Sequence, residues 1–409
     1  MKHKLFLLVA LISLTLIVSC SKSDSGPKTI SITAVNPEKL YTGIQVTVTG
    51  ENFGTDTSIL SCRLDSRKMV ITNLTNSSIT FTIPQNFIKS GQLRCALELE
   101  AQGRLASRIV VVNFLEPHGW FYTATISNSL RSGSQSFKQL IFPTDSIGYA
   151  QRYKDVYRST DGGLTWREDL LSGGMGLGNA IASSDGIHVW IEWVGQTAVT
   201  SNGGADWVLG PGNTAFGIII GLYTTAPATG LMAGETGRLY DYNGSYTGVL
   251  KYQSSIYNGL NALWQKMSVF DKNNLIIAGT SKNVVIEKAG VFTEVDISSI
   301  TTSSVINGVQ MIDANTAFLV NGNDELIKYA GNTWTKLTQK ANAVFFINTT
   351  TGYISYNNKI LKTTDGGASW KDEFSLNATE KVAAICARNG KVWALGNDDK
   401  QGFVLKYNP

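Results

Sequence analysis

The side chains that most often carry out chemistry are few in this chain. Three histidines and four cysteines occur, and with neither a Cys-x-x-Cys nor a His-x-x-x-His spacing the sequence offers no recognisable transition-metal site. No glycine-rich phosphate loop stands at a strand-to-helix junction, and no Gly-x-Ser-x-Gly marks a nucleophilic serine. We therefore predict no catalytic residue, no metal and no cofactor.

The composition favours many short strands joined by tight turns. Only 16% of the 409 residues are charged, against roughly 25% in an average soluble domain, and there are 40 glycines but 8 prolines. The length allows two or three domains. The formal charge is only +4, with 35 basic and 31 acidic residues, so no large field drives nucleic-acid binding and we expect no nucleic-acid partner.

The chemistry that the first residues indicate is acylation of Cys20. Basic residues precede an apolar run of 14 residues from Leu5 to Val18, which is shorter than the roughly 20 that span a bilayer, so residues 1–19 are predicted to be a signal peptide. The run Ile17-Val18-Ser19-Cys20 resembles the lipobox of bacterial lipoproteins. The resemblance implies a lipid anchor at Cys20, with the membrane as a partner; the alternative is a chance cysteine after an ordinary signal peptide.

Residues 20–27 are then a lipidated tether, since they are small and polar and have no hydrophobic periodicity. Ser21, and not Asp, follows the cysteine, which by resemblance to Gram-negative sorting implies the cell outer membrane. The run Lys22-Ser23-Asp24 partly resembles the export tag of Bacteroidetes surface lipoproteins. Periplasmic and outward-facing orientations both stay open.

Residues 28–117 alternate apolar and polar side chains in short strands such as Ile79–Ile83, which predicts an immunoglobulin-like β-sandwich. The run Val46–Gly54 resembles the IPT/TIG domain. In it Gly50 lies where a strand turns sharply and Phe53 supplies an aromatic plug beneath that turn. Such domains usually act as spacers or protein-binding modules, and we expect a spacer.

Two cysteines of this domain, Cys62 and Cys95, lie on candidate strands. An exported chain meets an oxidising compartment, so they could form a disulfide; the alternative is two buried thiols.

From residue 118 to 409 a unit of roughly forty residues recurs, a period typical of propeller blades. Its most legible part is a strand, a turn and a tryptophan, and it resembles the BNR/Asp-box of β-propellers. The second copy departs from the motif, with Asn for Asp and Asp206 for Thr. We expect a structural role, in which the acidic residue accepts backbone hydrogen bonds and the tryptophan packs between blades. The residues concerned are Asp161 and Trp166, Asn202 and Trp207, and Asp365 and Trp370.

Seven copies can be counted, and the last has only three strands. The segment Trp120–Thr125 precedes the first copy without a partner, and pairing it with Gly402–Tyr407 would leave neither edge open. The predicted fold class is therefore all-β, an immunoglobulin-like β-sandwich followed by a seven-bladed β-propeller closed by both ends of the array. The blades resemble those of photosystem II assembly or stability factors and, less closely, sialidases and xyloglucanases.

Ligand binding is expected on the loops that join second to third strands, at the end opposite the Asp-box turns. These loops carry aromatic, amide and charged groups, the combination that recognises sugars or peptides. The candidate binding residues are Arg152, Tyr153, Trp193, Glu235, Arg238, Lys282, Asn323 and Tyr356.

The leading functional hypothesis is a non-catalytic lipoprotein that binds a glycan or another envelope protein. An envelope assembly or scaffold factor is the alternative. A glycoside hydrolase is a third, since its paired carboxylates cannot be recognised by spacing alone. The recurring aspartates between inner and middle strands look like turn formers: Asp145, Asp185, Asp271 and Asp313. The oligomeric state is left open.

Overall fold

The structure is a computed structural model that describes residues 28–85, 87–88, 91–126, 136–152, 155–169, 179–193, 196–212, 217–226, 229–243, 248–257, 263–398 and 401–409. The signal peptide, Cys20 and the tether lie outside the described residues. Every regular element within these ranges is a β-strand, which confirms the all-β class. The chain divides into two compact units, Met1–Leu115 and Glu116–Pro409. In the part that the structure describes, no helix is long and apolar enough to cross a membrane.

Unit 1 contains two sheets that share one hydrophobic core, in which Val46, Phe53 and Phe81 are fully buried. The first sheet has the order β1-β3-β7-β6, with β1 (Ser31–Asn36), β3 (Gln45–Glu51), β7 (Ser78–Thr82) and β6 (Ile71–Thr75). The second has the order β2-β9-β8-β4-β5, with β2 (Leu40–Tyr41), β9 (Arg104–Asn113), β8 (Gln92–Ala101), β4 (Leu60–Leu64) and β5 (Arg67–Lys68).

The turn after β3 has the local structure that its residues predict. A Cβ atom on Gly50 would lie 1.8 Å from the Ser31 carbonyl oxygen and 2.6 Å from the ring of Phe53, so only glycine fits there. Gly54 has a φ of +77°, in the left-handed region. Phe53 is thereby held beneath the turn as an aromatic plug.

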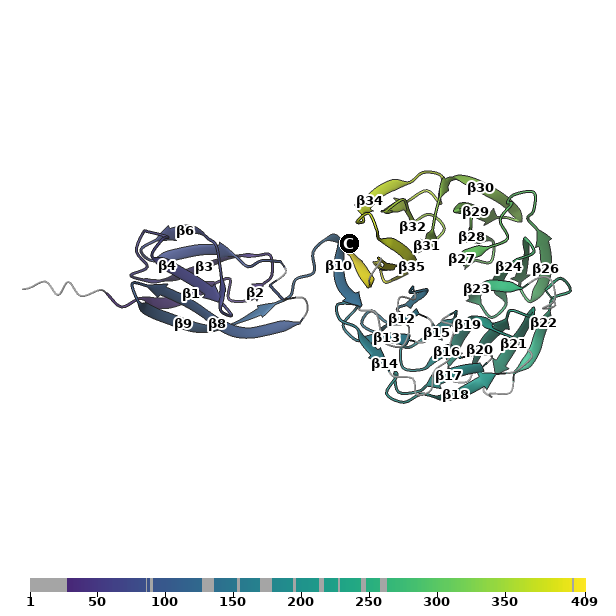
Figure 1. Ribbon diagram of the computed structural model, residues 1–409, viewed down its shortest axis with the longest axis horizontal. Helices are drawn as coiled ribbons and strands as arrows, with labels where there is room; N and C mark the ends of the chain where they lie inside the picture. Colours follow the sequence, from purple (N-terminus) through teal and green to yellow (C-terminus); the bar gives the residue numbers. More distant parts are fainter. Residues whose placement is uncertain are drawn as a thin grey trace, which may run out of the picture. The chain divides into compact units, whose positions relative to one another are not determined.

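Unit 2 contains, within the described residues, seven four-stranded antiparallel sheets that surround a common axis (Figure 1). In six of them four consecutive strands follow one another outwards from the axis. These strands are β11 (Gln139–Ile141), β12 (Gly148–Arg152), β13 (Asp155–Ser159), β14 (Arg167–Asp169); β15 (Ile181–Ser183), β16 (Val189–Trp193), β17 (Gln196–Thr200), β18 (Val208–Gly212); β19 (Ile219–Ala226), β20 (Thr229–Gly234), β21 (Arg238–Asn243), β22 (Val249–Gln253); β23 (Trp264–Asp271), β24 (Asn274–Gly279), β25 (Asn283–Lys288), β26 (Val291–Asp296); β27 (Ile306–Asp313), β28 (Thr316–Asn321), β29 (Glu325–Ala330), β30 (Thr333–Lys340); β31 (Ala343–Phe346), β32 (Gly352–Tyr356), β33 (Lys359–Thr363) and β34 (Lys371–Ser375).

The seventh sheet combines both ends of the unit, in the order β10-β37-β36-β35. It consists of β10 (Gly119–Ile126), β37 (Gly402–Asn408), β36 (Lys391–Asn397) and β35 (Lys381–Arg388). The antiparallel register runs from Gly119 opposite Asn408 to Ile126 opposite Gly402, with a bulge between Tyr122 and Ala124. The predicted pairing of the early segment with the last strand is confirmed, and it gives β37 a partner on each side.

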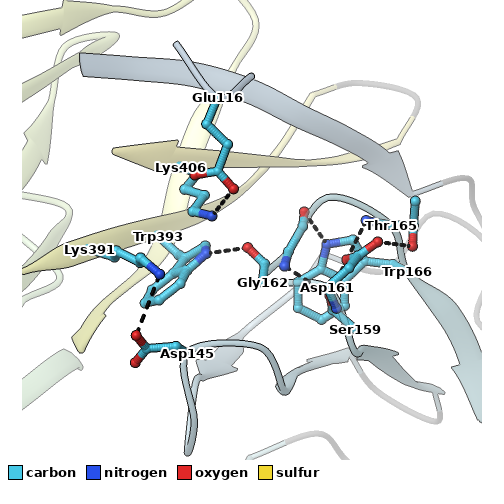
Figure 2. Close-up of polar contacts among 11 residues, drawn as sticks. Glu116, Asp145, Ser159, Asp161, Gly162, Thr165, Trp166, Lys391, Trp393 and Lys406 are labelled. Carbon is cyan, nitrogen blue, oxygen red and sulfur yellow. Dashed lines mark hydrogen bonds and ion pairs between the residues drawn. The ribbon is translucent and has the colours of Figure 1, made fainter. Parts of the chain in front are cut away.

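Side chains of the first and seventh sheets interlock where the ring closes (Figure 2). The fully buried Trp393 stacks on Phe142 with ring centroids 3.9 Å apart, and its indole Nε1 donates to the Gly162 carbonyl oxygen at 2.8 Å. The buried Lys406 ammonium lies 2.6 Å from a carboxylate oxygen of Glu116. Trp393 therefore holds the seventh sheet against the first, and the contact of Lys406 with Glu116 ties β37 to the segment that leads into β10.

The sheets of unit 2 pack face to face, and the second strand of each sheet is buried between the neighbouring sheets. Leu275–Ala278 of β24 and Ala317–Val320 of β28 are completely buried. Strands covered on both faces need apolar residues throughout, which explains why these segments lack the alternation seen in unit 1.

Candidate functional site

The three turns that join third to fourth strands at Ser159–Trp166, Thr200–Trp207 and Thr363–Trp370 are here called the box turns. In the first, Asp161 accepts hydrogen bonds from the Thr165 backbone N–H at 2.9 Å and from the Thr165 hydroxyl at 2.6 Å. The Trp166 indole donates to the Gly163 carbonyl at 3.1 Å, and its ring meets Phe142 edge-on. These contacts, drawn in part in Figure 2, fix the turn internally and leave the carboxylate committed to it.

In the second box turn the hydrogen-bond donor and acceptor side chains are exchanged between the two motif positions. Asn202 Oδ1 accepts from the backbone N–H of Asp206 at 3.0 Å, while Asn202 Nδ2 donates to the Asp206 carboxylate at 2.9 Å. The donor and acceptor have swapped residues relative to Asp161 and Thr165. This exchange explains why the two departures from the motif occur together.

In the third box turn Asp365 accepts from the Ser369 hydroxyl at 2.5 Å and from the Ser369 backbone N–H at 2.9 Å. These hydrogen bonds stabilise the ionised form and hold the pKa of Asp365 well below its usual range. A carboxylate that keeps its charge and already has its donors is suited to holding a turn, and it is a poor general acid.

The recurring aspartates between first and second strands also hold turns. Asp271 accepts from the Asn273 backbone N–H at 2.8 Å, and Asp313 accepts from the Asn315 N–H at 2.7 Å. Asp185 accepts from two backbone N–H groups in the same way. Asp145 is different, because its carboxylate lies 3.4 Å from the Lys391 ammonium across the ring closure.

In unit 2 six described sheets are four-stranded meanders and the seventh contains the three-stranded meander β35-β36-β37, so successive loops fall alternately at opposite ends of the ring. The box turns mark one end, here called the box end. The inner strands begin at the other, here called the channel end, and the loops joining second to third strands lie there too. Backbone hydrogen bonds join these loops to the residues just before the inner strands. The Glu235 N–H donates to the Ile218 carbonyl and the Gly322 N–H to the Val305 carbonyl, both at 2.8 Å.

Arg152 differs from the prediction that placed it on the binding face. The side chain is buried, its Nε donates to Asp155 at 3.1 Å and its Nη2 donates to the Tyr157 hydroxyl at 2.8 Å. The guanidinium also lies 5.0 Å from the ring centroid of Phe137. Asp155 and the two rings supply the charge and the π-faces that draw the guanidinium into the core.

The other candidates lie at the channel end, as their loops require. Glu235, Lys282 and Tyr356 are half-buried, Asn323 is exposed, and the half-buried Arg238 donates from Nε to Gln253 Oε1 at 2.7 Å. Tyr153 lies outside the described residues, as does the side chain of Trp193. A half-buried side chain presents part of its surface to a ligand while its base is held by the protein.

A central channel opens at the same end, and its lining was missed by the sequence-based prediction. The cavity has a volume of about 180 Å³ and is lined by the inner strands of all seven described sheets. Its polar side chains come from residues within the first three positions of these strands or up to two positions before them: Lys138, Gln139, Asn179, Lys266, Asn307 and Asn342. Aligning the copies of the repeat could have revealed this lining, because Lys266 stands at a position where most other copies have a small residue.

Lys266 is the electrostatically unusual residue of the channel. Burial, with a smaller contribution from repulsion by Lys138, lowers the pKa of Lys266 to about 8. Among the described residues, no carboxylate pairs with its ammonium group, and the cavity lining contains no Asp or Glu. Lys138 Nζ is 3.4 Å from Asn179 Oδ1.

The described cysteines, Cys62, Cys95 and Cys386, are free thiols, so the disulfide that Cys62 and Cys95 could have formed is not present. Cys62 of β4 lies opposite Leu99 of β8, four residues along the strand from Cys95. This offset corresponds to about 13 Å, beyond the Cα separation of about 7 Å that a disulfide can bridge. Burial raises the pKa of Cys62 to about 12, which makes its thiol unreactive.

Within the described ranges, no group of three or more His, Cys, Asp or Glu side chains is placed to hold a metal ion.

Part of unit 1 matches a known domain family. Residues 31–106 match the family model of the IPT/TIG domain. No curated protein matches the chain in sequence.

Several solved structures share the fold. YCF48 bound to D1 peptide is 13% identical with a TM-score of 0.56, over 72% of this chain and 98% of that one. The WD40 β-propeller domain of Doa1 is 14% identical with a TM-score of 0.53, over 71% and 97%. An auxiliary nutrient binding protein from Bacteroides thetaiotaomicron is 10% identical with a TM-score of 0.50, over 93% and 98%. These likenesses show a propeller fold in unit 2.

Proposed function

We propose that this chain is a lipoprotein of the cell outer membrane, anchored through Cys20, whose seven-bladed Asp-box propeller binds a glycan or an envelope protein without catalysing a reaction. The IPT/TIG domain, an immunoglobulin-like sandwich, serves as the spacer. One observation carries the binding role: the channel end gathers half-buried charged and aromatic side chains around a cavity whose described lining includes two lysines and no Asp or Glu. The solved neighbours include proteins named for a bound peptide and for nutrient binding, in line with this role.

The two ends of unit 2 support a binding role and argue against a hydrolytic one. At the box end the carboxylates of Asp161, Asp365, Asp271 and Asp313 are engaged in turns. At the channel end the described residues of the cavity lining include no carboxylate pair of the kind that glycoside hydrolysis needs. A surface that presents cations, amides and rings around a cavity without a described carboxylate is suited to holding a polar partner.

The binding role is tested with the detergent-solubilised full chain on an array of bacterial envelope glycans, and in parallel by affinity capture from envelope extracts. Lys282→Ala and Tyr356→Ala should each weaken binding about tenfold or more, since each removes a contact at the channel end. Lys371→Ala, on the exposed outer strand β34, is the matched control and should bind as the unchanged chain does. Equal binding by all variants would refute the assigned face, and turnover of a glycoside would refute the non-catalytic role.

The array and the capture separate the two kinds of target. Glycan binding without a fixed protein partner supports the carbohydrate target. A fixed envelope partner without glycan binding supports the assembly factor. Cys20→Ser should move the protein from the membrane fraction to the soluble fraction, and retention in the membrane would contradict the anchor.

A further inference from the structure

A second cavity lies on the outer rim of unit 2, between the fourth sheet (β23–β26) and the fifth sheet (β27–β30), which are neighbours in the ring (Figure 1). It has a volume of about 270 Å³, and its walls come from β25, β26, β29 and β30 and the turn between the last two. Lys288 ends β25 and Asn332 lies in that turn, so the cavity is on the box-end side of the ring. It is called the rim cavity below, and it is separate from the channel end.

Two aromatic rings line the rim cavity. Tyr329 and Trp334 lie opposite each other on β29 and β30, with ring centroids 5.0 Å apart. The junction between the sixth and seventh sheets has a similar pair, Tyr407 and Trp120, with ring centroids 5.6 Å apart. At the junction between the third and fourth sheets, Phe292 occupies the position of the tryptophan. Three junctions of the ring can therefore be compared.

The rim cavity exists because the outer strand of the fourth sheet carries a small residue at one position. Tyr252 has this position in the third sheet, and it stacks on Phe292 with ring centroids 4.2 Å apart and planes inclined by 7°. Phe374 has it in the sixth sheet and meets Tyr122 edge-on at 5.7 Å. The fourth sheet has Val295 there. A ring of the protein thus fills two junctions, and at the third a cavity remains beside the aromatic pair.

Polar groups stand beside the rings of the rim cavity. The Asn332 Oδ1 atom accepts hydrogen bonds from the Lys288 ammonium and from the Tyr329 hydroxyl, both at 2.8 Å. These contacts orient the Asn332 amide so that its Nδ2 group and the other protons of the ammonium can donate to a ligand. Thr293 adds a hydroxyl group, and the described lining contains no Asp or Glu.

This lining suits a ring that has an apolar face and several oxygen atoms. Trp334, Ile286 and Val295 offer apolar contact, and the donors beside them can meet the oxygen atoms. The ring of a phenylalanine or tyrosine would use the aromatic wall but would bring at most one oxygen atom to the polar groups. The volume of about 270 Å³ is just below the roughly 300 Å³ at which sites for drug-sized molecules begin, which favours a single ring.

We propose that the rim cavity binds one pyranose residue of a glycan. The apolar face of the sugar packs on the Trp334 ring, where the junction of the third and fourth sheets has Tyr252 on Phe292. Its hydroxyl groups accept from Lys288 and Asn332. This site goes beyond the proposed function, which places binding at the other end of the ring, and a variant of one site should leave the other unchanged.

The test is calorimetric titration of the detergent-solubilised full chain with the methyl glycosides of glucose, galactose, mannose and N-acetylglucosamine, each taken separately to millimolar concentration. At least one should bind. Val295→Phe supplies the ring that the other junctions have, so it should weaken that binding about tenfold or more. Trp334→Ala removes the stacking surface and should weaken it to a similar extent. Val208→Phe adds the same ring at an exposed position of another outer strand and is the matched control, with unchanged binding.

Three results would overturn the inference. They are the absence of binding by all four glycosides, unchanged binding in Val295→Phe, and tighter binding of N-acetyltyrosine amide than of every glycoside, which would identify the aromatic side chain of a partner protein as the occupant. Circular dichroism of each variant verifies that it is folded, and Val295→Phe remains informative if Trp334→Ala does not fold.

The loop variants separate this site from the proposed function. If Lys282→Ala and Tyr356→Ala abolish capture of a partner while no glycoside binds at the rim, the channel-end role stands and the rim site falls. If Val295→Phe abolishes glycoside binding and the loop variants change nothing, the rim site stands and the channel-end role falls.

Discussion

At the box end of unit 2 the carboxylates of Asp161 and Asp365 meet hydroxyl and backbone donors within their own turns. At the channel end Lys266 has no carboxylate partner among the described residues, and the cavity that it lines contains a second lysine. The same seven meanders supply both ends. A repeat can therefore devote one set of loops to stability while the other end carries polar side chains around a cavity.

The largest effect is expected at the ring closure. Trp393→Ala removes a fully buried ring, its stacking on Phe142 and its hydrogen bond to Gly162. We expect the free energy of unfolding of unit 2 to fall by about 3–5 kcal/mol, the usual cost of truncating a buried tryptophan. Urea unfolding followed by circular dichroism measures it.

Trp393→Phe separates packing from polarity at this position. It keeps an aromatic ring on Phe142 but loses the indole donor, so the loss should be smaller than for alanine, and the hydrogen bond itself should account for about 0.5–1.5 kcal/mol. If alanine cost no more than phenylalanine, stacking would not hold the closure and the assigned role of this tryptophan would be wrong.

A second change removes the hydrogen bond from the Asn202 amide to the Asp206 carboxylate in the second box turn. Asn202→Asp replaces the amide donor by a carboxylate oxygen facing that of Asp206, at a site where donor and acceptor are now 2.9 Å apart. We expect a loss of about 1–2 kcal/mol at pH 7 from the lost hydrogen bond and the added repulsion. Thermal unfolding at pH 7 and pH 4 measures it.

The pH dependence has a definite sign. Repulsion raises the pKa of the new pair in the folded variant, so the folded state binds more protons and the variant recovers stability as the pH falls. The double variant Asn202→Asp with Asp206→Thr recreates the first box turn and should be close to the natural chain. A single variant that lost nothing, or a double variant no better than the single one, would show that the two departures are unrelated.

The box turns and the ring closure could be predicted from the sequence because their determinants are local or periodic. The turn residues stand within eight positions of one another, and an unpaired strand at each end of the array indicates closure. Phe53 and Gly50 are likewise neighbours in the chain, and the IPT/TIG match covers them. Local patterns of this kind predict the structure well because few contacts with residues distant in the sequence compete with them.

The errors and omissions have the opposite cause. Arg152 occupies a loop-adjacent position, and only the pairing with Asp155 and the ring of Phe137 shows that it is a core residue. The distance between Cys62 and Cys95 depends on the register of β4 and β8. The environment of Lys266 arises from seven inner strands that are far apart in sequence, so a single copy of the repeat gives no sign of it.

The smallest effect is expected at the channel end, in the stability of Lys266→Met in the absence of ligand. Because the pKa of Lys266 is lowered to about 8, the unfolded state binds the proton more tightly than the folded state does, and the ammonium destabilises the fold below pH 8. That penalty disappears as the pH rises from about 8 towards the ordinary lysine value of about 10.4.

Methionine keeps the chain length without the charge, so the Lys266→Met variant should be more stable than the natural chain at pH 7. The difference should be under about 1 kcal/mol, since water reaches the channel. The advantage should shrink by pH 10. Thermal unfolding at both pH values measures it, with Lys371→Met as the control, and a variant less stable at pH 7 than the natural chain would mean that a group of the protein already compensates Lys266, which would remove the contrast between the two ends.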